Sequence, residues 1–239
     1  MEALSEVKLG PCRDSPYLRP LRIHYTQNGT RKHWDFMQTH DSVSILIFNT
    51  TRQSFVLVKQ FRPAVYMCEC ARRGIMPTVD TASKDCSPQS LVAGELLPAS
   101  AGVTYELCAG IVDKSDLSLQ EIAKEEVLEE CGYNVSVGNL QKITSYRSGV
   151  GVTGSKHTMF YVEVSDELCV GAGGGKVEEG ELIEVVHLPL KDWQTFMLDE
   201  CVPKTAGVNF AFMWFQNTIA PQLQASKCPL TSSQRTSAL

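Results

Sequence analysis

The sequence predicts one α/β domain in which a mixed β-sheet is sandwiched between helices. Short runs rich in Val, Ile and Phe recur before and after one glutamate-rich helical segment, and a second, apolar helical segment follows them. With 239 residues, of which 43% are hydrophobic and 21% charged, the chain has an ordinary globular composition and enough material for a large core.

Residues 1–38 are expected to form a strand extension ahead of the main domain. The segment LRIHYTQNGTRKHWDF (21–36) contains two strand-like runs around Asn28-Gly29, the strongest short signal for a β-hairpin. An isolated hairpin is only marginally stable in water, so we expect this one to pack on a partner subunit.

The main domain is predicted to span residues 39–222. Its first strands are SVSILIFN (42–49) and SFVLVKQF (54–61). Residues 67–100 are rich in Cys, Pro, Gly, Ser and charge without any period, which predicts a long loop. The segment GVTYELCAG (102–110) is then expected to form one strand.

The glutamate-rich helix is predicted from SLQEIAKEEVLEECGY (118–133). Ser118 and Glu121 have the spacing of a capping box, and Gly132 suits the end of the helix. Three strands and a buried helix should follow, in the segments LQKITSYRS (140–148), KHTMFYVEV (156–164), LIEVVHLPL (182–190) and PKTAGVNFAFMWFQNTIA (203–220). The tail, residues 223–239, has little to bury and is expected to be disordered.

Composition and charge exclude several classes of protein. The net charge of -5 and the lack of a basic block argue against nucleic-acid binding. No apolar run reaches the roughly 18–20 residues of a membrane span, and MEALSEVKLGPCRDSP lacks the pattern of a signal peptide. The nine cysteines fit free thiols in a reducing compartment. We therefore expect a cytoplasmic protein without nucleic-acid or membrane partners.

The predicted helix carries an unusual charge distribution. Glu125, Glu126, Glu129 and Glu130 crowd its last turns, where the helix dipole is already negative and carboxylates at i,i+4 repel one another. A divalent cation with oxygen ligands would turn this repulsion into attraction. A solvated acidic face is the alternative, and charge alone leaves both open.

The segment AGIVDKSDLSLQEIAKEEVLEECGY (109–133) resembles the Nudix box, G-x5-E-x7-R-E-U-x-E-E-x-G-U with U aliphatic. Gly110 matches the first glycine. The second half of the motif matches in register at Glu126, Val127, Glu129, Glu130 and Gly132. Glu125 stands at the motif's arginine position, and the loop near Asp116–Ser118 is one residue longer than the motif.

The resemblance implies a Nudix fold and a magnesium site at which manganese can substitute. It makes Glu126 and Glu130 the main metal ligands, with the carbonyl of Ala109 as a backbone ligand. Glu129 becomes a further ligand or an orienting catalytic carboxylate.

The order VKQFRPAVY, YELCAGIVD and then a Y-x-S-G turn resembles the ADP-ribose and nucleotide-sugar pyrophosphatase branch of the family. Members of that branch are commonly dimers that exchange N-terminal strands, which implies a homodimer. The turn YRSGVGVTGS (146–155) lacks the S-P-G and following glutamate of many ADP-ribose enzymes. This difference favours nucleotide sugars over strict ADP-ribose specificity. The resemblance implies magnesium-dependent hydrolysis of the small-molecule nucleotide sugar UDP-glucose to UMP and glucose 1-phosphate, with ADP-ribose as a second substrate.

The resemblance also places a general base in KVEEGELIEV (176–185), with Glu181 first and Glu179 next. A solvent-exposed acidic loop is the alternative. Arg62 could donate to a phosphate or serve as a structural arginine at a strand end.

Contacts to substrate are also expected at Gly110, Ser148 and Gly149. The glycine-rich turn at 148–149 could approach phosphates through its N–H groups or be a plain hairpin turn. Other functions remain open: an ADP-ribose-preferring pyrophosphatase, a catalytically weak Nudix-fold binding module suggested by Glu125, or an acidic structural protein that binds calcium or nothing.

Overall fold

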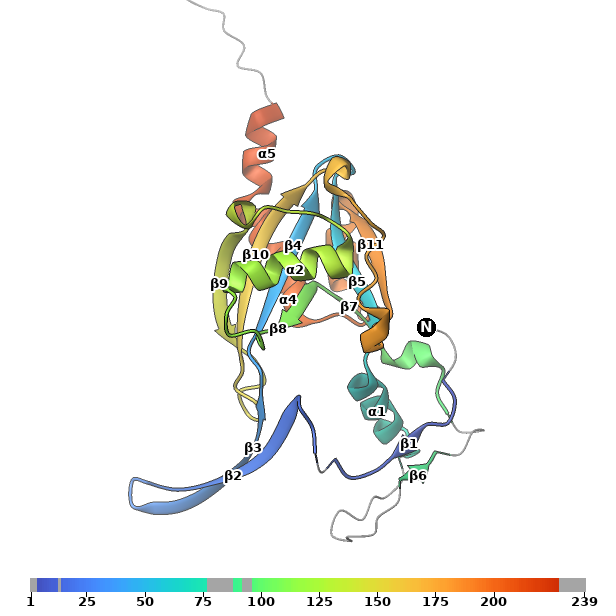
Figure 1. The fold of residues 1–239 in the computed structure, drawn as a ribbon, viewed down its shortest axis with the longest axis vertical. Helices are drawn as coiled ribbons and strands as arrows, with labels where there is room; N and C mark the ends of the chain where they lie inside the picture. The colour runs from blue at the N-terminus through green and yellow to red at the C-terminus, as the bar shows by residue number, and fades with distance from the viewer. Residues whose placement is uncertain (1–3, 13, 77–87, 92–95, 228–239) are drawn as a thin grey trace, which may run out of the picture.

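The computed structural model describes residues 4–12, 14–76, 88–91 and 96–227, and it confirms the predicted α/β fold (Figure 1). A seven-stranded sheet has the order β11-β5-β4-β10-β9, with β7 beside β5 and β8 beside β4. Its strands are β4 (Ser42–Asn49), β5 (Ser54–Phe61), β7 (Val103–Glu106), β8 (Cys108–Ile111), β9 (Gln141–Arg147), β10 (Lys156–Val164) and β11 (Ile183–Pro189). The sheet is mixed because β10 runs parallel to β4 while the other pairs are antiparallel.

Helices cover both faces of this sheet, as predicted. Figure 1 shows α2 (Leu119–Cys131) across one face and α4 (Ala206–Thr218) behind the other, and α3 (Trp193–Leu198) also packs on that second face. Side chains alternate along a strand, so β4 contributes to both cores. Val43 and Ile45 belong to the core under α2, whereas Leu46 and Phe48 belong to the core under α4. Short 3₁₀ turns connect the elements at Ala99–Gly102, Val137–Asn139, Asp166–Leu168, Val177–Glu179 and Leu190–Asp192.

The segment 102–110, predicted as one strand, forms two. β7 pairs with β5 and β8 pairs with β4, so the chain changes partner at the buried Leu107. Local residue pattern could not reveal this change, because it depends on which distant strands are available for pairing.

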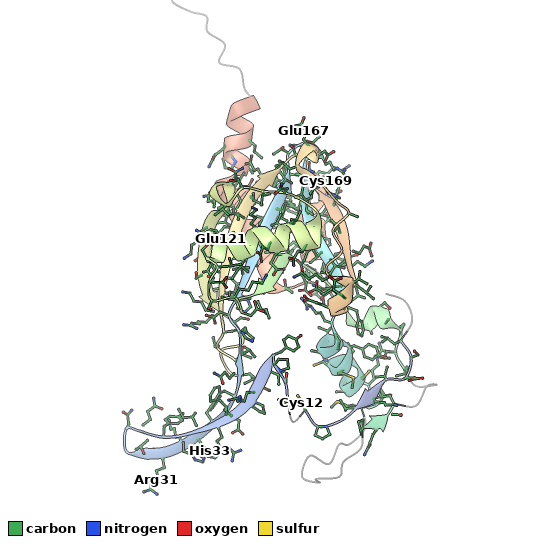
Figure 2. The ribbon with its side chains drawn as sticks, viewed as in Figure 1. Cys12, Arg31, His33, Glu121, Glu167 and Cys169 are labelled. Atoms are coloured by element: carbon green, nitrogen blue, oxygen red, sulfur yellow. The ribbon has the colours of Figure 1, made fainter. Side chains whose placement is uncertain are left out.

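The predicted N-terminal hairpin is present as β2 (Leu18–Gln27) and β3 (Thr30–Thr39). Asn28 and Gly29 adopt φ of 51° and 78°, the left-handed conformation that a two-residue hairpin loop requires. The hairpin projects from the body, with Arg31 and His33 near its far end (Figure 2).

The region predicted as a loop at 67–100 is partly ordered. Helix α1 (Pro63–Arg72) occupies its first residues, and Pro63 sits at the start of the helix, where its missing N–H costs nothing. Tyr66, Cys70 and Leu91 form a small separate core, beside which β1 (Lys8–Leu9) pairs with β6 (Gln89–Ser90). Residues 77–87 and 92–95 of this region lie outside the described residues.

At the C-terminus, α5 (Ala220–Lys227) extends into the tail predicted as disordered, so the first part of that tail is helical. Residues 228–239 lie outside the described part of the chain. Within the described ranges, no helix combines the length and apolar character needed to cross a membrane.

The core under α4 offers a stability test on two phenylalanines of one helix. Phe212 is 1% exposed and its ring centroid lies 4.5 Å from that of Phe55. Phe212→Ala should lower the free energy of unfolding by about 3–5 kcal/mol, because a buried aromatic is lost and a cavity remains. Phe210, which is 47% exposed, provides the control. In urea unfolding, equal losses for Phe212→Ala and Phe210→Ala would contradict this packing.

Candidate active site

Helix α2 begins and ends where the sequence predicts. The Ser118 hydroxyl accepts a hydrogen bond from the Glu121 N–H at 3.2 Å, and the Glu121 carboxylate accepts one from the Ser118 N–H at 2.8 Å. Figure 2 shows Glu121 at this first turn. Gly132 ends the helix with φ of 76°, where a Cβ atom would lie 2.1 Å from the carbonyl oxygen of Gly171. Glycine is therefore required both by the turn and by the close approach of the loop.

The glycine-rich loop before β11 caps the C-terminal end of α2. The N–H of Gly174 donates to the Glu130 carbonyl at 2.9 Å, and the N–H of Gly175 donates to the Glu129 carbonyl at 3.1 Å. The carbonyls in the last turn of a helix lack partners within the helix, so these donors satisfy them. The loop that carries Glu181 is thereby fixed to the helix that carries the box glutamates.

Glu126 and Glu130 point toward β8. Glu130 is 4% exposed, and its Oε2 accepts a hydrogen bond from the Ala109 N–H at 2.9 Å. Gly110 makes room for Glu126, because a Cβ atom at Gly110 would lie 2.0 Å from the Glu126 Oε1. The predicted residues Ala109 and Gly110 thus lie directly against the two principal carboxylates.

Burial disfavours the negative charge on both of these carboxylates. Burial raises the pKa of Glu126 to about 7, with the nearby charges of Glu129 and Glu181 adding to the effect. Burial raises the pKa of Glu130 to about 8, and the charge of Glu126 adds to it although the Ala109 N–H opposes it. Partly buried oxygen donors that need a counter-charge fit a hard divalent cation such as magnesium.

Glu129 forms an ion pair with a lysine of the glycine-rich loop. Its Oε2 lies 2.8 Å from the Lys176 Nζ, which also lies 3.7 Å from the Glu179 Oε1. The hydrogen bond to Glu129 raises the pKa of Lys176 to about 12. In the part of the chain that the structure describes, no three His, Cys, Asp or Glu side chains converge closely enough to hold a metal ion. Glu126 and Glu130 both face β8, whereas the Glu129 carboxylate pairs with Lys176 while its charge acts on Glu126.

The arginine position of the motif is occupied by Glu125, which forms an ion pair with Lys114 on the flank of the helix. This contact offsets one of the four helix charges, and the Lys114 charge also acts on Glu126. A second cation at the motif, Lys176, comes from the glycine-rich loop and pairs with Glu129.

Glu181 lies beside the carboxylate pair. Its Oε2 accepts a hydrogen bond from the Lys176 N–H at 2.8 Å, and its charge acts on both Glu126 and Glu130. The strand register explains this placement. Ile183 of β11 pairs with Gln60 of β5 in antiparallel register. Glu181 lies two residues before Ile183, and Arg62 lies two residues after Gln60. Because the strands are antiparallel, both residues lie at the same end of this strand pair.

Arg62 makes a bidentate ion pair with Glu106 of β7, with both N···O distances at 2.8 Å. Glu106 also accepts a hydrogen bond from the Thr104 hydroxyl at 2.6 Å. The guanidinium carries five N–H donors, so this pairing does not exhaust it. Arg62 feels the charges of Glu130 and Glu181, which places it at the border of the candidate site.

Sequence reasoning missed three of these residues. Glu106 and Thr104 gave no local signal, because their roles depend on pairing between β5 and β7. Lys176 did give one: it is the cation closest in sequence to Glu178 and Glu179. Counting charges along the loop could have identified it.

Ser148 and Gly149 are not brought to the glutamates. They lie in the turn between β9 and β10, beside β3 in Figure 1. The Val152 carbonyl of this turn accepts from the Met37 N–H at 2.7 Å, and the Gly151 carbonyl accepts from the Trp34 indole at 3.0 Å. The substrate-binding roles of Ser148 and Gly149 remain predictions.

The raised pKa values predict how the stability of the metal-free protein depends on pH. The folded state holds protons on Glu126 up to pH about 7 and on Glu130 up to about 8, whereas the unfolded chain releases them near 4.5. Stability should therefore fall as pH rises from about 4.5 to 8 in the presence of EDTA. Glu130→Gln should remove much of this decline in thermal melts, and Glu125→Gln on the helix flank should not. A wild-type melting temperature that rises over this range would contradict the buried pair.

Comparison with known proteins supplies an independent observation. No family model matches the chain. The chain is 56% identical over 223 residues to the uridine diphosphate glucose pyrophosphatase NUDT14 of Bos taurus, a match that covers 93% of this chain and 99% of the relative. The protein of the same name from Mus musculus is 53% identical with the same coverage. A GDP-mannose pyrophosphatase of Pectobacterium atrosepticum is 31% identical over 160 residues, which are 66% of this chain and 64% of the relative.

Proposed function

Because the chain belongs to the nucleotide-sugar pyrophosphatases of the Nudix family, we propose that it hydrolyses the pyrophosphate bond of UDP-glucose to UMP and glucose 1-phosphate. Two relatives that match it over 93% of its length bear the name of that activity. Other nucleoside diphosphate sugars and ADP-ribose are candidate further substrates, and the activity belongs in the cytoplasm.

One observation carries the proposal at the level of the site. Glu126 and Glu130 both face β8, and burial disfavours the negative charge on both carboxylates. These residues would hold magnesium, with manganese as a substitute and the Ala109 carbonyl as an additional ligand. When bound, a divalent cation neutralises the charge of the diphosphate and polarises a phosphoryl oxygen.

The remaining groups act on water and substrate. Glu181 is the candidate general base, since it lies beside the carboxylate pair on a loop rather than on the helix. It would take a proton from the water that attacks phosphorus as the bridging P–O bond breaks, with Glu179 as the second candidate. Arg62, held in a fixed orientation by Glu106, would donate its outward N–H groups to a phosphate oxygen.

The test uses Glu126→Gln and Glu130→Gln with UDP-glucose and magnesium. Each substitution should lower kcat by more than about 100-fold, because losing a ligand should cost more than the 10–100-fold typical of residues behind the ligands. Release of phosphate by an added phosphatase reports UMP and glucose 1-phosphate. Wild-type turnover in either variant would remove that residue from the site.

Binding measured without turnover separates the remaining alternatives. At a hundredfold excess over Kd, magnesium should stabilise the wild type by about 2.7 kcal/mol and Glu130→Gln by much less. A wild type that is stabilised but inactive would be a binding module. Faster turnover of ADP-ribose than of UDP-glucose would assign the alternative specificity, and no stabilisation by magnesium would indicate a solvated acidic helix.

The proposal extends to a homodimer formed through the hairpin. Leu21 pairs with Phe36, and Ile23 pairs with Trp34, so these apolar side chains share one face of the hairpin. Ile23 is 49% exposed and Trp34 is 56% exposed within the single chain. Packing this apolar face against a second copy of the chain would remove it from water and lower the free energy.

A charge introduced on either face of the same strand tests this assembly. Ile23→Glu should convert a dimer into a monomer in light scattering, because it buries an unpaired carboxylate in the contact. His24→Glu adds the same charge to the opposite face and should leave the dimer intact. A wild type that is monomeric at micromolar concentration would count against the dimer.

A further inference from the structure

The loop before β11 reaches the end of α2 through its main chain and through one side chain. The main-chain contacts, from Gly174 and Gly175 to the carbonyls of Glu130 and Glu129, are independent of side-chain identity. The side-chain contact is made by Lys176, the next residue. Residues 174–176 therefore hold the loop to the helix by two neutral hydrogen bonds and one charged contact.

Lys176 connects three of the carboxylates predicted to be catalytic. Its ammonium lies 2.8 Å from the Glu129 Oε2 and 3.7 Å from the Glu179 Oε1. The main-chain N–H of Lys176 donates to the Glu181 Oε2 at 2.8 Å. The side chains of Lys176 and Glu129 are 32% and 28% exposed, so their ion pair is screened less than one in open solvent.

The second lysine beside this helix provides a comparison. Lys114 pairs with Glu125, and these side chains are 43% and 40% exposed. Its contact lies on the flank of α2, and the loop with Glu181 takes no part in it. The two lysines thus form similar ion pairs with the same helix, but one of them also holds the loop.

We propose that Lys176 is a positioning residue: its side chain anchors the loop to α2 through Glu129, and its main chain orients Glu181 beside the Glu126–Glu130 pair. Glu129 then supports the loop as well as belonging to the Nudix box. The loss of the ammonium would leave Glu129 repelled by its neighbours and would weaken the hold of the loop on α2. Glu181 would then spend less time in its productive position.

The kinetic test rests on the proposed function and compares Lys176→Met, Lys176→Arg and the matched control Lys114→Met. With UDP-glucose and magnesium, Lys176→Met should lower kcat by about 10–100-fold, the range for residues that support a metal site. KM should change little, because Lys176 holds Glu129 and Glu181 rather than substrate. Lys176→Arg should recover most of kcat, since arginine keeps the charge, and Lys114→Met should resemble the wild type.

A second measurement does not depend on activity. Amide hydrogen exchange at Gly174 and Gly175, followed in the metal-free protein, reports how often the loop leaves the helix. Exchange should be at least about tenfold faster in Lys176→Met and unchanged in Lys114→Met, since opening rises with the loss of the charged anchor. Equal melting temperatures for the two methionine variants would show that this opening is local.

The outcomes separate the two proposals. If the wild type hydrolyses no nucleotide sugar, the proposed function fails, while the exchange experiment still decides whether Lys176 holds the loop. Unchanged exchange in Lys176→Met overturns the inference whatever its activity. Wild-type kcat in Lys176→Met, or a loss of kcat that Lys176→Arg does not restore, overturns the positioning role.

Discussion

The C-terminal end of α2 concentrates negative charge where the helix dipole is already negative, and the candidate site is built around that constraint. Three effects reduce the unfavourable energy of this negative charge. Main-chain N–H groups of the glycine-rich loop cap the last carbonyls. Lys114 and Lys176 each pair with one glutamate. Burial raises the pKa of Glu126 and Glu130, so the remaining charge is reduced by bound protons in the absence of a cation.

The sheet brings the parts of the site together. Residues 109 and 110 of β8 provide the surface against which Glu126 and Glu130 pack. The pairing of β5 with β11 brings Arg62 and Glu181 to one edge, although they are far apart in sequence. Helix α2 supplies the carboxylates of Glu126 and Glu130, and the register of the strands places Arg62 and Glu181 near them.

Local sequence patterns predicted much of this structure. The bounds predicted for β4 and β5 match those observed, and the capping box at Ser118 begins α2 as expected, because these features depend on neighbouring residues. The split of 102–110 into two strands, the helix α1 and the pairing of Arg62 with Glu106 were not predicted. Each depends on contacts between distant segments, which a residue pattern does not record. The turn at Ser148 resembles a phosphate-binding turn in composition, yet the fold places it beside β3.

The ion pair between Arg62 and Glu106 also closes the base of the connection between β5 and β7. The Arg62 N–H donates to the Gly102 carbonyl at 2.8 Å, so the two ends of this connection are joined by main chain as well as by side chains. For a loop with fixed ends, the entropic cost grows only slowly with length. The length of chain between α1 and β7 therefore adds little to the entropic cost of joining these ends, and the joined ends hold Arg62 beside Glu106.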